Sequence, residues 1–126
     1  MLVPDAGAYL RLPWESIDRA SWDNDSRRLV VVEVAEYGQV NPRRSAVFDD
    51  ASILLRLIRE RVTASVVMSR FVPVDGRRGL SVVGRRAPGT DGPVSWSFVI
   101  DPGLDVDDPL VRAAADSALE AAEQEL

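Results

Sequence analysis

The sequence predicts an α+β fold built from antiparallel strands and two helices. Short segments that are valine-rich or alternate in polarity, as strands do, occur in residues 9–48 and again in residues 66–100. Turn residues separate one such segment from the next. An apolar stripe with helical spacing lies between these runs, and an alanine-rich stripe ends the chain. We therefore expect an antiparallel strand meander, a helix at about 50–63, a three-stranded antiparallel meander at about 66–100, and a C-terminal helix at about 108–125.

The first meander is predicted to hold four strands. Residues 9–14 alternate in polarity and residues 15–22 form a weaker strand candidate, with a turn following at 23–26. The valine-rich run at 28–37 is the clearest strand of this half, and a short strand returns at 45–48.

The strand at 9–14 has no earlier strand to pair with, because it begins within ten residues of Met1. Two explanations stay open at this point. The strand is an edge that needs another chain, or the chain is N-terminally truncated and has lost the strands that would pair with it.

The central helix follows two acids, Asp49 and Asp50, which we expect to cap it and to complement its dipole. Five apolar residues share one predicted face: Ile53, Leu54, Leu57, Ile58 and Val62.

The second meander opens with a hairpin whose turn begins at Asp75 and Gly76, and a longer turn at 88–93 leads to its third strand. Trp96 and Phe98 in that strand are predicted to face the core. The alternation then leaves Val83 and Val99 on the outer face of the sheet. Apolar side chains such as these are not expected on a face of a sheet that water covers. We therefore expect the last helix or a second subunit to cover this face. Val83 and Val99 are therefore the candidate oligomer face.

The C-terminal helix has a specific start signal, with Asp108 as N-cap and Pro109 at the first helical position. Its small-residue stripe predicts close packing on a sheet; the members are Val111, Ala114, Ala115, Ala118, Leu119 and Ala122.

Composition is that of a globular chain: 126 residues predict a single domain, with 46% hydrophobic and 28% charged residues. No apolar run approaches the roughly 20 residues of a membrane span. The beginning of the chain lacks a signal-peptide pattern, so we expect a cytoplasmic protein without a transmembrane segment.

The side-chain inventory argues against catalysis. The chain has no histidine and no cysteine, and all 15 basic residues are arginine, which reflects either a GC-rich genome or a demand for guanidinium groups. Imidazole bases, thiolates and amine nucleophiles are thereby excluded, and nothing in the spacing marks a carboxylate pair. The acids at 101–108 fit capping and turns better than a calcium loop. We expect no enzyme, no cofactor and no metal site.

Charge is uneven along the chain, whose net charge is −5. Residues 51–100 carry most of the arginines, and the last 26 residues are strongly acidic. Arg77, Arg78, Arg85 and Arg86 are the candidate anion-binding residues, for nucleic acid or an acidic lipid. The alternative is that the acidic helix lies across these arginines and neutralises them. Because about seven strand steps separate the two arginine pairs, they lie ~20–25 Å apart and form two patches.

The stretches RLPWESIDRASWD, RERVTASVV and RRAPGTDGPVSWSF resemble a family of uncharacterised bacterial proteins from high-GC genomes, over nearly the whole chain. That resemblance implies no catalytic residue, and it implies an extra strand or two ahead of YLRLPWESI. Residues 8–63 also resemble bacterial pleckstrin-homology-like domains in pattern, although a helix interrupts the strands. Such modules mostly bind, so the resemblance implies a binding role.

The functional expectation is a non-catalytic binding or assembly module that acts through protein–protein contacts, with a homodimer as its expected form. Recognition of an anionic ligand by the arginine hairpin at 77–86 is the alternative.

Overall fold

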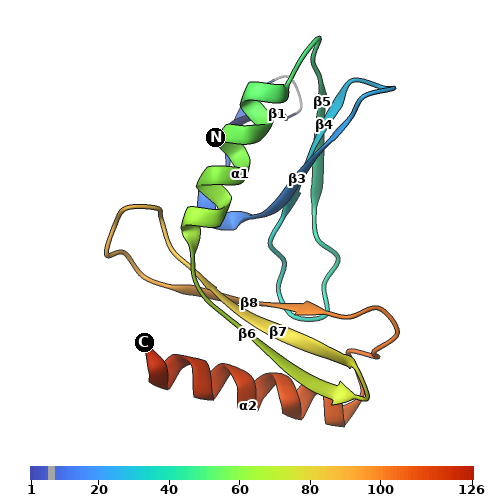
Figure 1. Ribbon diagram of the computed structural model, residues 1–126, viewed down its shortest axis with the longest axis vertical. Helices are drawn as coiled ribbons and strands as arrows, with labels where there is room; N and C mark the ends of the chain where they lie inside the picture. Colours follow the sequence, from blue (N-terminus) through green and yellow to red (C-terminus); the bar gives the residue numbers. More distant parts are fainter. Residues whose placement is uncertain (6–7) are drawn as a thin grey trace.

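The computed structural model describes residues 1–5 and 8–126, arranged as two lobes (Figure 1). The N-terminal lobe ends with residue 65 and the C-terminal lobe begins with residue 66. The N-terminal lobe holds β1 (Leu2–Asp5), β2 (Ala8–Arg11), a 3₁₀ turn (Trp14–Ser16), β3 (Ile17–Asp23), β4 (Arg28–Glu33), β5 (Arg43–Val47) and α1 (Ser52–Ser65). The C-terminal lobe holds β6 (Val66–Asp75), β7 (Arg78–Arg85), β8 (Ser95–Ile100) and α2 (Pro109–Glu125).

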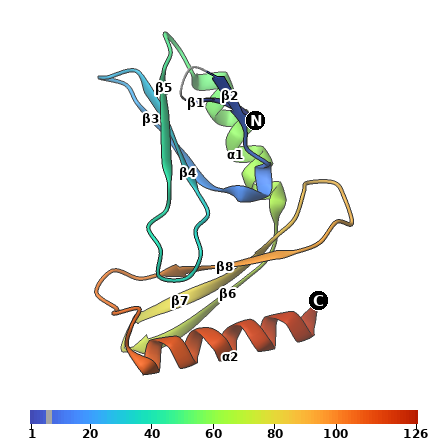
Figure 2. The ribbon, with the colours of Figure 1, turned by 180° about the vertical axis from the view of Figure 1, so that it is seen from behind.

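Neighbouring strands in both lobes are antiparallel, so the predicted α+β class is confirmed. The N-terminal lobe has a three-stranded sheet of order β3-β4-β5 and a two-stranded ribbon of β1 and β2. The C-terminal lobe has the predicted meander, β6-β7-β8, with α2 along one face (Figure 2). No helix in the described part of the chain is long and apolar enough to cross a membrane.

The expectation that the first strand lacks an earlier partner is wrong. β1 pairs with β2, with Leu2 opposite Arg11 and Val3 opposite Leu10. The backbone of Met1 and Leu12 closes the open end of this ribbon, since the Leu12 N–H donates to the Met1 carbonyl. Sequence reasoning missed β1 because four residues are too few to show a period.

The valine-rich strand is shorter than predicted, because β4 ends at Glu33. There the Glu33 carbonyl accepts a hydrogen bond from the Asn41 side chain at 2.8 Å. The next residue, Val34, donates its N–H to the carbonyl of Ser16. Tyr37 then leaves the N-terminal lobe and packs against the core of the other lobe.

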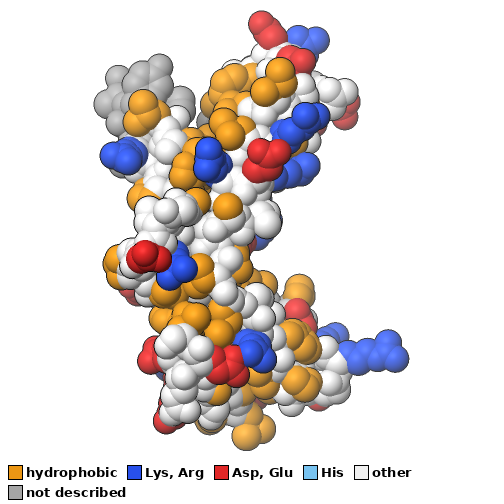
Figure 3. All heavy atoms as spheres, turned by 60° about the vertical axis from the view of Figure 1, so that its left-hand side comes forward, with side chains coloured by type: hydrophobic (Ala, Val, Ile, Leu, Met, Phe, Trp, Pro, Cys, Tyr) orange, Lys and Arg blue, Asp and Glu red, His pale blue; other side chains and the backbone are white. Residues whose placement is uncertain are grey.

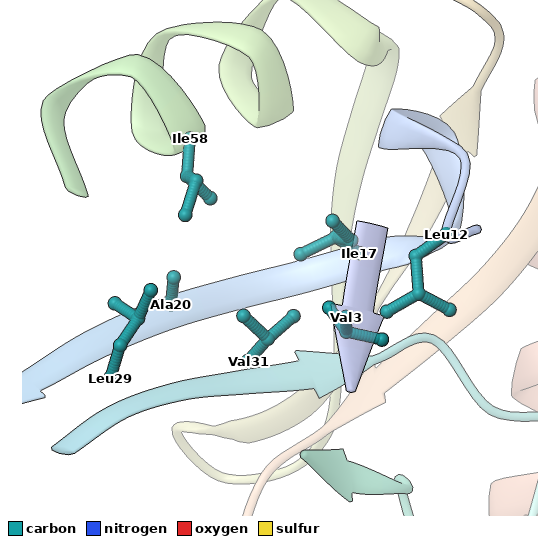
Figure 4. Packing of buried hydrophobic residues seen from close by; sticks show 7 residues of the cluster. All are labelled: Val3, Leu12, Ile17, Ala20, Leu29, Val31 and Ile58. Carbon is teal, nitrogen blue, oxygen red and sulfur yellow. The ribbon is translucent and has the colours of Figure 1, made fainter. Parts of the chain in front are cut away.

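The N-terminal core lies between the β3-β4-β5 sheet on one side and α1 with the β1-β2 ribbon on the other (Figure 4). Its buried members are Val3, Leu12, Ile17, Ala20, Leu29, Val31 and Ile58. The predicted face of α1 is only partly correct. Leu54, Ile58 and Val62 pack on the core, but Ile53 and Leu57 are exposed and Leu55 packs instead. The helix also starts later than predicted: Ala51 is the N-cap, and Asp50 accepts a hydrogen bond from the Ser52 N–H at 2.9 Å.

The C-terminal core follows the prediction closely. Asp108 accepts a hydrogen bond from the Leu110 N–H at 2.9 Å and so caps α2 ahead of Pro109. The alanine-rich stripe then packs on the inner face of β7, and the buried residues are Leu80, Val82, Val111, Ala115, Ala118 and Ala122.

α1 runs into β6 with no connecting loop, since Ser65 ends the helix and Val66 begins the strand. Ser65 is fully buried, its hydroxyl donates to the Val62 carbonyl, and its own carbonyl accepts from the Arg86 N–H. The N-terminal lobe therefore rests on the face of the β6-β7-β8 sheet opposite α2, as both ribbon views show (Figures 1 and 2).

Candidate functional site

The four candidate anion-binding arginines do not meet in one place. Arg77 lies in the turn of the β6-β7 hairpin and Arg78 begins β7, and both are exposed. Arg85 is 4% exposed at the other end of β7, and Arg86 next to it is half-buried. The expectation that Arg85 belongs to a surface patch is therefore corrected.

Arg85 is part of the junction between the lobes. Its guanidinium donates to the Ser97 hydroxyl at 2.6 Å and to the Asp18 carboxylate at 3.0 Å, while its Nε has no hydrogen-bond partner among the described residues. Burial lowers the pKa of Arg85, and the charge of Asp18 opposes that shift. A buried arginine of this kind is costly unless paired, and its partner is supplied from within the chain.

The acidic helix neutralises the basic segment only locally. Within the described residues, one ion pair joins α2 to the β6-β7-β8 sheet, between Arg70 and Glu125. Arg112 of α2 lies over the ring of Tyr37, 5.2 Å from its centroid.

The candidate oligomer face is also divided. Val83 is 5% exposed, because the N-terminal lobe covers this part of the sheet, so it is not available to a second subunit. Val99 is half-exposed, and Phe71 lies on the same face with Ser81 between them. This pair is a small apolar spot at the uncovered end of the sheet.

A second apolar surface lies in the N-terminal lobe. Hydrophobic side chains are exposed over both lobes on the face seen in Figure 3. An open groove runs beside β5, and Leu2 and Val47 along it are 66% and 62% exposed. Its lining includes Leu2, Trp14, Ala46, Val47, Phe48 and Leu54. Apolar groups gathered in one open groove are typical of a contact surface for another protein.

The groove follows an unpaired sheet edge. β5 pairs with β4 alone, and β1 nearby belongs to a different sheet. The Phe48 N–H donates to the Arg27 carbonyl, and the Pro42 carbonyl accepts from the Glu33 N–H. In this register the even-numbered residues of β5 also direct their backbone N–H and C=O groups toward β4. The backbone N–H and C=O groups of successive residues point to opposite sides of a strand. Those of Arg43, Ser45 and Val47 therefore point away from β4, toward the open edge of the sheet.

Among the described residues, the side chains with clearly shifted pKa values are Asp23, Tyr37, Asp50 and Arg85. No group of three or more acids is placed to hold a metal ion in the described part of the chain. Hydrogen bonds from nearby backbone N–H groups lower the pKa values of Asp23 and Asp50, as turn and helix-entry acids should show. Burial raises the pKa of Tyr37, and Arg112 opposes that shift.

Sequence reasoning missed the groove, because its parts come from β1, β5 and α1, which are far apart in the chain. One local signal was available. The segment 43–50, RRSAVFDD, starts with two arginines and ends with two aspartates around a short uncharged centre. Comparison of the chain with protein-family models, with curated proteins and with solved structures gives no match.

Proposed function

We propose that this protein is a non-catalytic binding or assembly module that acts through protein–protein contacts, and that its first partner is a second copy of itself. The observation that carries the proposal is the open apolar groove beside the unpaired edge of β5. An exposed edge strand with apolar neighbours is a ready template for pairing with another chain.

Three further points support a binding role. The chain has no histidine, cysteine or lysine, so imidazole bases, thiolates and amine nucleophiles are missing. The shifted pKa values of the described carboxylates have local structural causes. The resemblance of residues 8–63 to pleckstrin-homology-like domains stays a prediction and agrees with binding. A cytoplasmic location is part of the same proposal.

Size-exclusion chromatography with light scattering tests the homodimer at high micromolar concentration. We expect a mass close to twice that of the 13.8 kDa chain. Val47→Ser and Leu2→Ser should shift the protein toward monomer, because both side chains lie on the groove. The matched control is Val40→Ser, since Val40 is 90% exposed but lies in the loop between β4 and β5, away from the groove. A clean monomer for the unaltered protein contradicts the homodimer.

A second candidate function is recognition of an anionic ligand by the hairpin tip. Arg77 and Arg78 are exposed there, and neither forms an ion pair with another described residue. Retention on heparin that falls with salt and is lost in Arg77→Ala/Arg78→Ala would support it. Retention that survives this double substitution would count against it.

A further inference from the structure

We propose that the second copy adds its β5 to the β5 edge, antiparallel, with the two-fold axis at Ala46. The inference rests on the proposed function and names its interface. Two three-stranded sheets would then join into one continuous sheet of six strands across the dimer. A two-fold axis makes the contact self-complementary, so it closes at two copies.

The backbone restricts the register. Only residues whose N–H and C=O groups point away from β4 can bond to an incoming strand, and these are Arg43, Ser45 and Val47. An odd-numbered residue must therefore face an odd-numbered residue of the partner. With the axis at Ala46, Ser45 faces the partner's Val47 within the strands. Arg43, the first residue of β5, faces the partner's Asp49, which lies two residues beyond the end of β5.

Charge complementarity selects a second copy as the occupant. Segment 43–50 has its two arginines at one end and its two aspartates at the other, so an antiparallel copy brings opposite charges together at both ends. Arg44 is already paired with Glu33 at 3.0 Å. Arg43 is exposed, and the fully exposed Asp49 has only a 3.9 Å contact with the exposed Arg27. These two residues therefore remain for pairing across the interface.

The two neighbouring registers fit less well. With the axis at Ser45, Arg43 would face the partner's Val47 and Asp49 would face the partner's Asn41, so no arginine would meet an aspartate. With the axis moved to Val47, Arg43 would face the partner's Ala51, which is 1% exposed, and Asp49 would face the uncharged Ser45. With the axis at Ala46, the Ala46 side chains of the two copies lie opposite each other at the centre of the interface. They form a non-hydrogen-bonded pair of the antiparallel ladder. Such pairs bring their Cα atoms to about 4.5 Å.

Cysteine cross-linking at the axis tests the register directly, because the chain has no cysteine of its own. A Cα separation of about 4.5 Å lies within the range for a disulfide. We expect Ala46→Cys to form a covalent dimer under mild oxidation, seen on a non-reducing gel. The control, Val40→Cys, carries a more exposed thiol on the loop between β4 and β5 and should stay mostly monomeric on the same gel.

Reversing the charges of Arg43 and Asp49 gives an independent test that needs no introduced cysteine. Arg43→Asp alone, or Asp49→Arg alone, should weaken dimerisation about tenfold or more, because two like-charged pairs form across the axis. The double variant Arg43→Asp/Asp49→Arg should restore it, whereas Arg77→Asp in the other lobe should have no effect.

The outcomes separate this inference from the proposed function. A dimer that neither cross-links at Ala46→Cys nor responds to the charge reversals overturns the β5 register and leaves the homodimer standing. A protein that is monomeric at high micromolar concentration overturns both.

Discussion

The carboxylate of Asp18 in β3 accepts a hydrogen bond from the guanidinium of Arg85 in β7 across 3.0 Å, and this contact joins the two lobes. The second oxygen of Asp18 accepts from Arg19 at 2.6 Å, and the second terminal nitrogen of Arg85 donates to Ser97. Asp18 therefore supplies the charge that makes a buried arginine tolerable at the junction.

Removing Asp18 should be costly. Asp18→Ala leaves the Arg85 guanidinium buried without its counter-charge, and we expect a loss of about 3–5 kcal/mol in the free energy of unfolding, measured by urea denaturation. Asp18→Ala/Arg85→Met should recover much of that loss, because the buried charge is then gone. Arg19→Ala removes only the exposed ion pair of the same carboxylate and should cost less than about 1 kcal/mol. Equal losses for Asp18→Ala and Arg19→Ala would contradict the assignment.

Tyr37 ties the loop between β4 and β5 to the C-terminal lobe, because its hydroxyl donates to the Val106 carbonyl at 2.8 Å. Its ring also meets Phe98 edge-on. Tyr37→Phe keeps the ring and removes the hydrogen bond, so we expect a loss of about 1 kcal/mol near pH 7.

The same substitution has a pH dependence with a defined sign. Burial raises the pKa of Tyr37 in the folded protein, so above the ordinary phenol pKa of about 10 the unfolded chain loses its proton first. The stability that the phenol contributes is present at neutral pH and is lost as the pH rises above about 10. Urea denaturation at pH 7 and pH 10.5 should show the cost of Tyr37→Phe shrinking. A cost that stays constant with pH would contradict this.

Gly79 in β7 lies close against the backbone of β6, where its partner in the strand pair is Pro73. A Cβ on this residue would collide with the Val72 carbonyl and would lie 2.7 Å from the ring of Phe71, which covers the glycine. Because a backbone atom is in the way, Gly79→Ala should destabilise the fold by about 1–3 kcal/mol. The control is Gly92→Ala in the 86–94 loop, whose nearest neighbour is a side chain that can move. Thermal unfolding of the two variants should differ clearly, and similar midpoints would count against the collision.

The cap of α2 gives a local test. Asp108→Ala removes the acceptor for the Leu110 N–H and should cost about 1 kcal/mol. Asp107→Ala removes the same negative charge one residue earlier, where the side chain does not cap the helix. It should leave the free energy of unfolding nearly unchanged. Denaturation curves of both variants at one ionic strength make the comparison.

Local patterns in the sequence were enough to predict α2 and the β6-β7 hairpin in the C-terminal lobe. The Asp108-Pro109 start and the alanine stripe of α2 depend on neighbours within a turn, and the Asp75-Gly76 hairpin depends on four residues. These features are confirmed because no distant segment competes with them.

The junction and the groove could not be predicted in the same way. Val83 and Arg85 look like surface residues within their own strand, yet the N-terminal lobe covers them. Conversely, Ile53 and Leu57 fit an apolar helical stripe but remain exposed, and Leu55 packs on the core in their place. Burial at these positions depends on how the two lobes meet, which no local pattern encodes. The single domain predicted from length stays a prediction.

The loop-free corner between Ser65 and Val66 ties the orientation of the lobes to the length of one helix. An α-helix turns by about 100° per residue, so inserting or deleting one residue in α1 would rotate β6 by that angle relative to β3. Asp18 and Arg85 would then point in different directions. Natural variants of this chain should therefore accept length changes in the 86–94 loop and resist them in α1, and a designer seeking a place for an inserted tag should follow the same rule.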